Sequence, residues 1–316
     1  MRALVIDREL CLRTDYPDPQ PAPGESIVRV ELAGICGTDL EIVHGYMAYR
    51  GVLGHEFVGR VIQSANPKLA GARVVGEINA ACGRCAYCAD GLGRHCPQRT
   101  VLGILGRDGA FADFLRLPDK NLIAIPDSLA GDVAVFTEPL AAAYEILEQI
   151  KIPPNKSTLI LGDGRLGAMV ALALRGEGYE VVLGGHHREK LDRLSKLGFT
   201  AVPEDQLAER CDFVIDCAGS AAALARAIDL VKPRGTIVLK STAALGANVN
   251  LSALVINEIT VIGSRCGRFK PALDALAGGR VDPRPLIDAT FALDEAVAAF
   301  EAARNPLNFK ILVRPA

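Results

Sequence analysis

The amino-acid sequence predicts an α/β fold in which a β-rich region is followed by a doubly wound parallel sheet. Residues 1 to about 125 contain short apolar runs broken by glycine and proline, which is typical of strands and turns. From about residue 140, apolar runs alternate with helical stretches of about ten residues, the pattern of βαβ units around a parallel sheet. The length of 316 residues exceeds what one hydrophobic core usually supports, so we expect two domains.

The expected elements follow in order along the chain. In the first region, 26–30 and 57–62 are expected strands, and 17–24, with four prolines, is expected to be an extended connector. The second region begins with an expected helix over 139–150, and the tail after about 264 ends in the apolar strand 310–313. Between them we expect strands at 158–161, 180–183, 213–215 and 236–239 and helices at 166–175, 188–197 and 221–230.

Composition limits the classes of partner. Half of the residues are hydrophobic and 23% are charged, as in an ordinary globular protein. The net charge is −2 and no long block of Lys or Arg occurs, so we expect neither a nucleic-acid nor a membrane partner. No apolar run reaches the roughly 18–20 residues that span a bilayer, and the first residues resemble a strand rather than a signal peptide. The sequence therefore predicts a cytoplasmic protein.

Four of the nine cysteines lie close together in the sequence. Cys82, Cys85, Cys88 and Cys96 fall within fifteen residues, and such clustering in a reducing compartment favours metal binding over disulfides. Four thiolates fill a tetrahedral shell and leave no position for water, which is typical of a structural zinc site. A nucleic-acid-binding zinc ribbon is the alternative, but the intervening residues are not notably basic and the cluster interrupts a β-rich region.

A second candidate metal site is dispersed over the first 140 residues. A single Cys or His is usually structural, so each of its three motifs is a weak signal alone. Together they supply a thiolate, an imidazole and a carboxylate, the mixed set typical of a catalytic zinc that keeps one position open for substrate. The motifs are Cys36-Gly37-Thr38-Asp39, Gly54-His55-Glu56 and Glu138-Pro139.

A glycine-rich motif links the expected strand 158–161 to the helix that follows. Gly162-Asp163-Gly164-Arg165-Leu166-Gly167 matches G-x-G-x-x-G, which binds a dinucleotide when it joins a strand to a helix. Gly162 allows the tight turn, Gly164 lets the backbone approach a pyrophosphate, and Gly167 allows the helix to pack closely on the strand. The start of the helix, at Arg165 and Leu166, offers unpaired N–H groups to the anion.

The end of the second strand of this unit indicates which nicotinamide cofactor is preferred. NAD-binding folds carry an acid there, about twenty residues after the glycine-rich motif, for the ribose hydroxyls. Here the residues are Gly185, His186, His187 and Arg188, with no carboxylate. Cationic donors favour a 2′-phosphate, which a carboxylate would repel, so we expect NADP(H). The alternatives are NAD(H), or a solvated helix start whose charges have no function.

These motifs, in this order, resemble the zinc-containing medium-chain dehydrogenase/reductase family over nearly the whole chain. The resemblance implies a GroES-like catalytic domain at 1–142, a Rossmann domain at 143–263, and a segment at 264–316 that returns to the catalytic domain. It implies one structural zinc on the four clustered cysteines and one catalytic zinc on Cys36, His55 and Glu138. Glu56 resembles the acid that can enter or leave the shell of the catalytic zinc.

The resemblance also implies roles for polar residues beside the catalytic metal. Thr38 resembles the hydroxyl that passes on the substrate proton, and Asp39 resembles an acceptor that orients His55. Many alcohol-active members carry a His where this chain has Glu41. That glutamate, together with Glu138 as the third ligand, is similar to the sugar, polyol and threonine dehydrogenase branch.

We therefore expect a zinc-dependent enzyme that transfers a hydride reversibly between NADP and an alcohol, polyol or sugar hydroxyl. The alternatives are an NADPH-dependent reductase of aldehydes or ketones, and a non-catalytic NADP(H)-binding protein of the same fold. Family members usually pair their Rossmann sheets edge to edge, and the apolar strand 259–262 is a candidate edge. The resemblance thus implies a homodimer or homotetramer.

Overall fold

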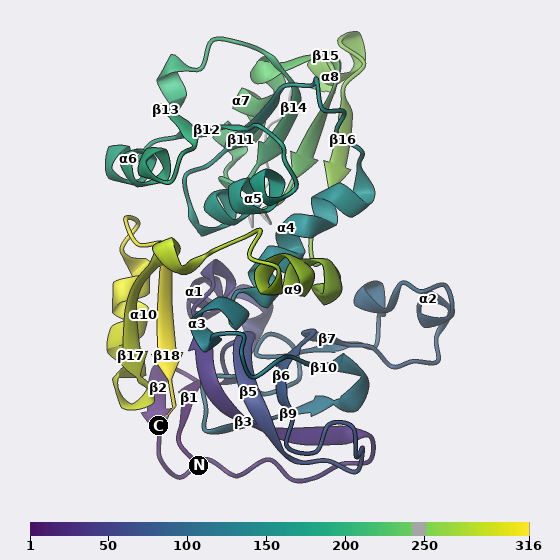
Figure 1. The fold of residues 1–316 in the computed structure, drawn as a ribbon, viewed down its shortest axis with the longest axis vertical. Helices are drawn as coiled ribbons and strands as arrows, with labels where there is room; N and C mark the ends of the chain where they lie inside the picture. Colours follow the sequence, from purple (N-terminus) through teal and green to yellow (C-terminus); the bar gives the residue numbers. More distant parts are fainter. Residues whose placement is uncertain (242–250, 316) are drawn as a thin grey trace. The chain divides into compact units, whose positions relative to one another are not determined.

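The structure, a computed structural model, describes residues 1–241 and 251–315. The chain divides into two compact units (Figure 1). Unit 1 comprises Met1–Glu138 and Leu286–Ala316, and unit 2 comprises Pro139–Pro285. The expected domain limits after residues 142 and 263 stay a prediction. No helix in the described ranges is long and apolar enough to cross a membrane.

Unit 1 is built around a seven-stranded sheet of order β10-β6-β5-β3-β18-β17, with β9 also paired to β3. On one side of β3, Gly34 is opposite Glu56; on the other side it is opposite Leu312. This register brings three distant segments side by side at the end of β3, just before Cys36. The strands are β3 (Glu25–Gly34), β5 (Glu56–Gln63), β6 (Arg73–Gly76), β9 (Phe114–Pro118), β10 (Leu122–Ala124), β17 (Ile287–Ala292) and β18 (Lys310–Arg314).

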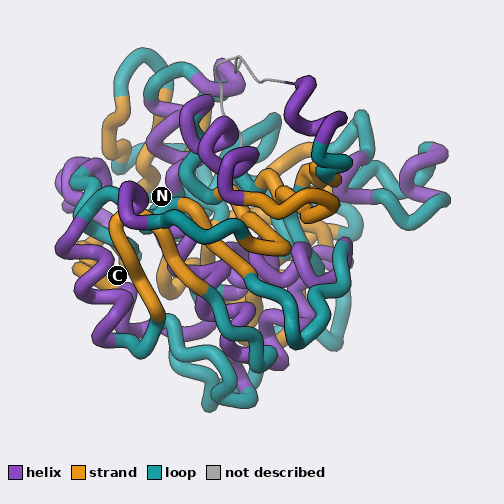
Figure 2. Tube along the Cα trace, turned by 90° about the horizontal axis from the view of Figure 1, so that it is seen from above, coloured by secondary structure: helices purple, strands orange, loops and turns teal. Residues whose placement is uncertain are grey.

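Smaller elements complete unit 1. The rings of Phe111 and Phe300 meet nearly at right angles, 5.5 Å apart, and attach the C-terminal segment to the N-terminal one. The loop between β7 and β8 carries α2 and projects from the strands of unit 1 in both views (Figures 1 and 2). These elements are β1 (Ala3–Ile6), β2 (Leu10–Arg13), β4 (Gly51–Val52), β7 (Asn79–Ala80), β8 (Thr100–Val101), α1 (Gly37–Val43), α2 (Ala86–Ala89), α3 (Gly131–Ala134) and α10 (Ala296–Arg304).

Unit 2 contains a six-stranded parallel sheet of order β13-β12-β11-β14-β15-β16. Successive strands are added on one side of β11 and then on the other, so the carboxyl end of β11 lies at a topological switch point. The strands are β11 (Thr158–Leu161), β12 (Val182–Gly185), β13 (Thr200–Pro203), β14 (Cys211–Asp216), β15 (Val231–Leu239) and β16 (Thr260–Gly263). The helices are α4 (Thr137–Gln149), which begins in unit 1, α5 (Arg165–Gly176), α6 (Arg188–Lys196), α7 (Ala221–Leu230), α8 (Leu251–Ile256) and α9 (Phe269–Ala277).

The predicted fold class is confirmed, with a β-rich unit and a parallel α/β unit. Several boundaries differ from the sequence prediction, and two of the differences concern β12 and β13. The strand expected at 180–183 is β12, which begins at Val182 and extends to Gly185, because the two glycines continue the ladder with β13. The strand β13 was not expected at all. It is a short edge strand that is only partly buried, so it lacks the apolar run by which inner strands are identified.

Candidate catalytic and cofactor sites

Cys36, His55 and Glu56 lie together at the end of β3 in unit 1. A sulfur of Cys36, a ring nitrogen of His55 and a carboxylate oxygen of Glu56 all lie within 4.8 Å of one another. His55 and Glu56 are buried, whereas Cys36 is partly exposed. Cys36 follows β3 and Glu56 begins β5, so the antiparallel pairing of these strands sets the distance between the two side chains. A thiol, an imidazole and a carboxylate are donors that suit zinc.

Asp39 is fully buried and joins the two motifs. Its Oδ2 accepts a hydrogen bond from the N–H of Cys36 at 2.8 Å, and its Oδ1 accepts one from the N–H of Gly54 at 3.2 Å. Nδ1 of His55 lies 3.2 Å from the same Oδ1. Burial alone would lower the pKa of His55, but the charges of Asp39 and Cys36 raise it well above its usual value. These surroundings are negative and therefore complementary to a divalent cation.

Glu56 is held from its other side by Lys310, a residue that sequence reasoning missed. Nζ of Lys310 donates to Oε2 of Glu56 at 2.5 Å and to the carbonyl of Ile35 at 3.3 Å, and both charged side chains are buried. Oε1 of Glu56 is also buried and has no hydrogen-bond partner in the described part of the chain. One oxygen is thus neutralised by Lys310, and the other fits a metal ion in the cluster. The sequence showed only a lysine at the start of an apolar strand.

Three other expected site residues lie outside the group formed by Cys36, His55 and Glu56. Glu138 lies in the first turn of α4. Its assignment as the third zinc ligand stays a prediction. Thr38 and Glu41 lie three residues apart on α1 and therefore project from neighbouring positions on the helix surface. Thr38 is partly buried and Glu41 is exposed.

The four clustered cysteines converge in the loop between β7 and β8. Their sulfur atoms all lie within 4.8 Å of one another, and none forms a disulfide. The Sγ–Sγ distances are 3.5 Å for Cys85–Cys88, 3.7 Å for Cys85–Cys96 and 3.9 Å for Cys82–Cys88. A tetrahedral zinc with Zn–S bonds of about 2.3 Å requires sulfur separations of about 3.8 Å. The three measured separations therefore match those around a tetrahedral zinc ion.

The loop has few other means of holding its conformation. Within it, α2 is only four residues long, and Tyr87 and Leu92 are exposed. A hydrogen bond from the backbone of Arg84 is the main cause that lowers the pKa of Cys82. This hydrogen bond favours the thiolate, which is the form that binds a metal. Because the loop buries little apolar surface, a bound metal would be its main source of stability.

The glycine-rich motif of unit 2 connects β11 to α5 as expected. Gly162 has φ +114°, and a Cβ at this position would lie 2.9 Å from the backbone nitrogen of Ala218. A Cβ at Gly167 would collide with the carbonyl oxygen of Gly162. A Cβ at Gly164 would meet nothing within 4 Å, and no side chain caps the start of α5. The loop therefore leaves open space beside Gly164 at the start of α5, as the binding of a pyrophosphate there would require.

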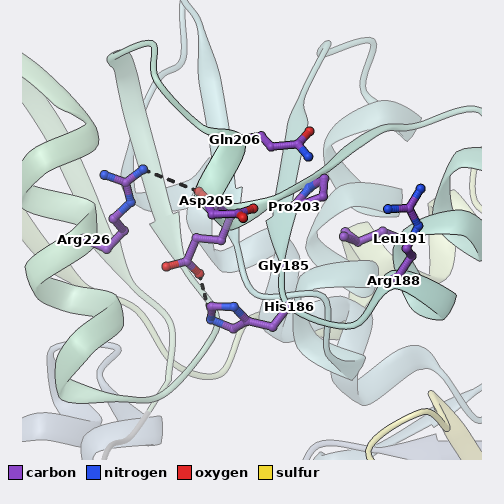
Figure 3. Close-up of a pocket in the computed structure, with 9 residues that line it drawn as sticks. Gly185, His186, Arg188, Leu191, Pro203, Asp205, Gln206 and Arg226 are labelled. Atoms are coloured by element: carbon purple, nitrogen blue, oxygen red, sulfur yellow. Dashed lines mark hydrogen bonds and ion pairs between the residues drawn. The ribbon is translucent and has the colours of Figure 1, made fainter.

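A pocket of about 540 Å³ lies at the carboxyl ends of β12 and β13. Gly185, His186 and Arg188 line it, as does Arg226, which lies on the opposite side from Arg188 in Figure 3. Nε2 of His186 is 3.1 Å from Oε2 of Glu204, an acid that sequence reasoning missed. Unlike its two neighbours, His187 does not line the pocket; its side chain contacts the glycine-rich motif.

Two family models match the chain. Residues 22–127 match the alcohol dehydrogenase GroES-like domain, and residues 166–278 match the zinc-binding dehydrogenase domain. The sorbitol dehydrogenase of Halalkalibacterium halodurans is 25% identical over 95% of this chain and 94% of its own length.

Two solved structures are similar over 99% of both chains. The short chain alcohol dehydrogenase (rspB) of Escherichia coli CFT073, complexed with NADH, is 27% identical with a TM-score of 0.90. A Sinorhizobium meliloti 1021 protein, assigned as a zinc-binding dehydrogenase and bound to NADP, is 28% identical with a TM-score of 0.91.

A GroES-like unit with two zinc-type donor clusters and a parallel sheet with a dinucleotide loop define a zinc-containing dehydrogenase. The chain belongs to the zinc-type medium-chain dehydrogenase/reductase family of alcohol dehydrogenase-like enzymes.

Proposed function

We propose that the protein oxidises an alcohol, polyol or sugar hydroxyl reversibly, with NADP as the hydride acceptor, and that polyols are its preferred substrates. The observation that carries the proposal is the cluster of partly exposed Cys36 with buried His55 and Glu56, in which Oε1 of Glu56 has no partner among the described residues. The Halalkalibacterium halodurans relative is a sorbitol dehydrogenase, which supports a polyol. Glu41, where alcohol-active members often carry a His, supports the same class.

Cys36, His55 and a carboxylate, either Glu56 or Glu138, would hold the catalytic zinc. The four clustered cysteines would hold a structural zinc. When bound at the first site, zinc would act as a Lewis acid that stabilises the alkoxide form of the substrate near neutral pH. Asp39 would keep His55 oriented through its buried carboxylate, which also fixes the backbone at Cys36 and Gly54.

The proton of the substrate hydroxyl would leave through residues of α1. Thr38 would accept it at its hydroxyl oxygen and release its own proton outward. Glu41 and His44 are both exposed and lie further along the same segment, so either could receive the proton from Thr38 and exchange it with water. The proposed path therefore leads from a partly buried hydroxyl to the solvent within two turns of helix.

NADP is proposed over NAD because the residue at the end of β12 is Gly185 rather than an acid. The neighbouring pocket carries two arginines, Arg188 and Arg226, together with His186, which pairs with Glu204, and a second acid, Asp205. Arginine is the residue that binds phosphate through two parallel hydrogen bonds. The Sinorhizobium meliloti protein of the same fold is bound to NADP, which supports this preference.

We also propose a homodimer or homotetramer that forms through the edge of the sheet in unit 2. β16 is an edge strand, and Val261 on it is exposed. The preceding helix α8 exposes Val255 and Ile256 to 77% and 78%. An exposed apolar edge strand invites pairing with the same strand of a second copy. Light scattering during gel filtration should give at least twice the chain mass for the wild type and a monomer for Val261→Lys; a monomeric wild type would refute the proposal.

The catalytic proposal is tested by a substrate panel and a zinc count. Alcohols, polyols and aldoses are offered with NAD⁺ and NADP⁺, and the corresponding aldehydes and ketones with NADH and NADPH. We expect two zinc ions per chain and the highest kcat/KM for a polyol with NADP⁺. A preparation that holds two zinc ions but turns over no member of the panel would contradict the proposal.

A further inference from the structure

The glycine-rich motif carries an acid whose side chain fills the space beside the end of β12. Asp163 is buried, with 5% of its surface exposed. A Cβ added at Gly185 would lie 2.5 Å from Cβ of Asp163 and 2.6 Å from its Cγ. Real atoms do not approach so closely, so side chains at 163 and 185 exclude one another. Asp163 thus occupies the place from which the ribose-binding acid of an NAD-binding fold projects.

Asp163 uses both of its carboxylate oxygens to hold His187. Oδ2 accepts a hydrogen bond from the N–H of His187 at 2.6 Å, and Nδ1 of the ring lies 3.0 Å from Oδ1 and 3.2 Å from Oδ2. A carboxylate can only accept, so Nδ1 carries a hydrogen in this contact and Nε2 is the ring atom left for another partner. The carboxylate is covered, whereas 39% of the His187 side chain is exposed.

We propose that Asp163 is a specificity-determining residue for the cofactor, because it presents an imidazole instead of a carboxylate at the ribose end of the dinucleotide site. The inference rests on the proposed use of NADP(H). His187 stands between His186 and Arg188, which line the pocket beside Gly185. An acid at 185 would accept the ribose hydroxyls and repel a 2′-phosphate. An acid at 163 is hidden behind His187, so the exposed group of the pair is one that can donate to phosphate.

Equilibrium binding tests whether the charge of Asp163 contributes to the preference for NADPH. NADPH and NADH are titrated against the zinc-loaded protein, with their fluorescence as the readout. Asp163→Asn keeps an acceptor for the N–H of His187 but removes the charge that orients the ring. We expect its Kd for NADPH to rise about tenfold, the effect of one lost charge-assisted hydrogen bond, with a smaller change for NADH. The ratio of the two Kd values should therefore shift toward NADH.

A matched control removes the same charge elsewhere in unit 2. Asp192 is exposed on α6, and Asp192→Asn should leave the ratio of the two Kd values unchanged. If Asp163→Asn also leaves the ratio unchanged, Asp163 does not determine specificity. If the wild type itself prefers NADH, the proposed NADP preference fails. The inference about Asp163 is then still judged by whether Asp163→Asn shifts the ratio of the two Kd values toward NADH.

The mutual exclusion of side chains at 163 and 185 gives a second test. Gly185→Asp alone should lower the melting temperature and weaken binding of both cofactors, because the new side chain meets Asp163. Gly185→Asp combined with Asp163→Gly, which removes the Cβ at 163 as well as the carboxylate, should restore the melting temperature and prefer NADH. The inference is overturned if Gly185→Asp alone is as stable as the double variant and binds NADH equally well. The melting temperature is measured without cofactor, so this result does not depend on activity.

Discussion

Nζ of Lys310 lies 2.5 Å from Oε2 of Glu56, inside the core of unit 1. The two residues are 254 positions apart and meet because β18 and β5 flank β3 on opposite sides. The ammonium group is also within 5.6 Å of the ring centre of Phe136, so an aromatic face covers it. Glu56 therefore has a permanent buried counter-ion, separate from any metal that its second oxygen binds.

Replacing Lys310 by Met should destabilise unit 1, because a buried carboxylate loses its cation. Removing one partner of a buried pair typically costs about 3–5 kcal/mol. Urea denaturation monitored by circular dichroism measures the loss. The double variant Lys310→Met with Glu56→Gln removes both charges and should recover most of the stability. If Lys310→Met alone is as stable as the wild type, Glu56 is neutralised by another group.

Replacing Cys36 by Ser should remove one zinc ion and leave the fold intact. The expected zinc content falls from two ions to one per chain, and activity falls roughly 100-fold or more, as for a strongly weakened metal site. Mass spectrometry of the metal content and a melting curve check both statements. Cys11 is exposed, so Cys11→Ser is the matched control and should keep two zinc ions. Full turnover by Cys36→Ser would refute the assignment.

Replacing Cys96 by Ser should destabilise the loop between β7 and β8 and leave the catalytic site intact. Cys96 is the buried member of the four-cysteine cluster, and its loss leaves three ligands for the structural zinc. We expect less soluble protein and rapid cleavage by trypsin after Arg84 or Arg94, since the loop loses its main source of stability. The Cys36 site should keep its zinc. An intact loop after zinc loss, resistant to trypsin, would contradict this role.

Stability should depend on pH through Asp212 in unit 2. Hydrogen bonds from Lys156, from Lys232 and from Ser157 hold the pKa of Asp212 well below its usual value. A carboxyl group whose folded pKa lies below the unfolded value of about 3.9 stabilises the fold above that pH. This contribution is lost as the pH falls through the folded pKa.

Asp212→Asn should therefore cost about 1 kcal/mol at pH 7. The difference from the wild type should narrow as the pH falls below about 4. Urea denaturation of both proteins across this range measures the difference, and Asp192→Asn serves as a control for charge alone. A constant difference at all pH values would mean that the side chain acts through its shape rather than its charge.

The fold and the four-cysteine cluster could be predicted from the sequence because their signals are local. The βαβ alternation, the glycine-rich motif between 158–161 and its helix, and the four cysteines within fifteen residues each occupy a short window. Cys36 and His55 are nineteen positions apart, and a known family pattern linked them. Each of these signals is set by residue type and spacing, which the sequence displays directly.

Lys310, Glu204 and the contact of Asp163 with His187 could not be predicted in this way. Lys310 reaches Glu56 only after β18 pairs with β3, and no feature near Lys310 in the sequence indicates that pairing. Glu204 reaches His186 because β13 forms the edge of the sheet, and β13 itself was missed. The clash between side chains at 163 and 185 depends on the exact distance between two adjacent strand ends, which spacing along the chain does not reveal.

The pairing of β18 with β3 has a consequence for how the protein is made. A ribosome releases the chain from the N-terminus, so Glu56 emerges long before its cation does. In the sequence, unit 2 is inserted between the two parts of unit 1. While unit 2 is being synthesised, the carboxylate of Glu56 must therefore stay hydrated or bind a metal without Lys310. Unit 2 is contiguous and can finish folding first. The ion pair between Glu56 and Lys310 therefore forms only after unit 2 has been synthesised, and a nascent chain stalled before Lys310 would carry the glycine-rich loop of unit 2 but lack this pair.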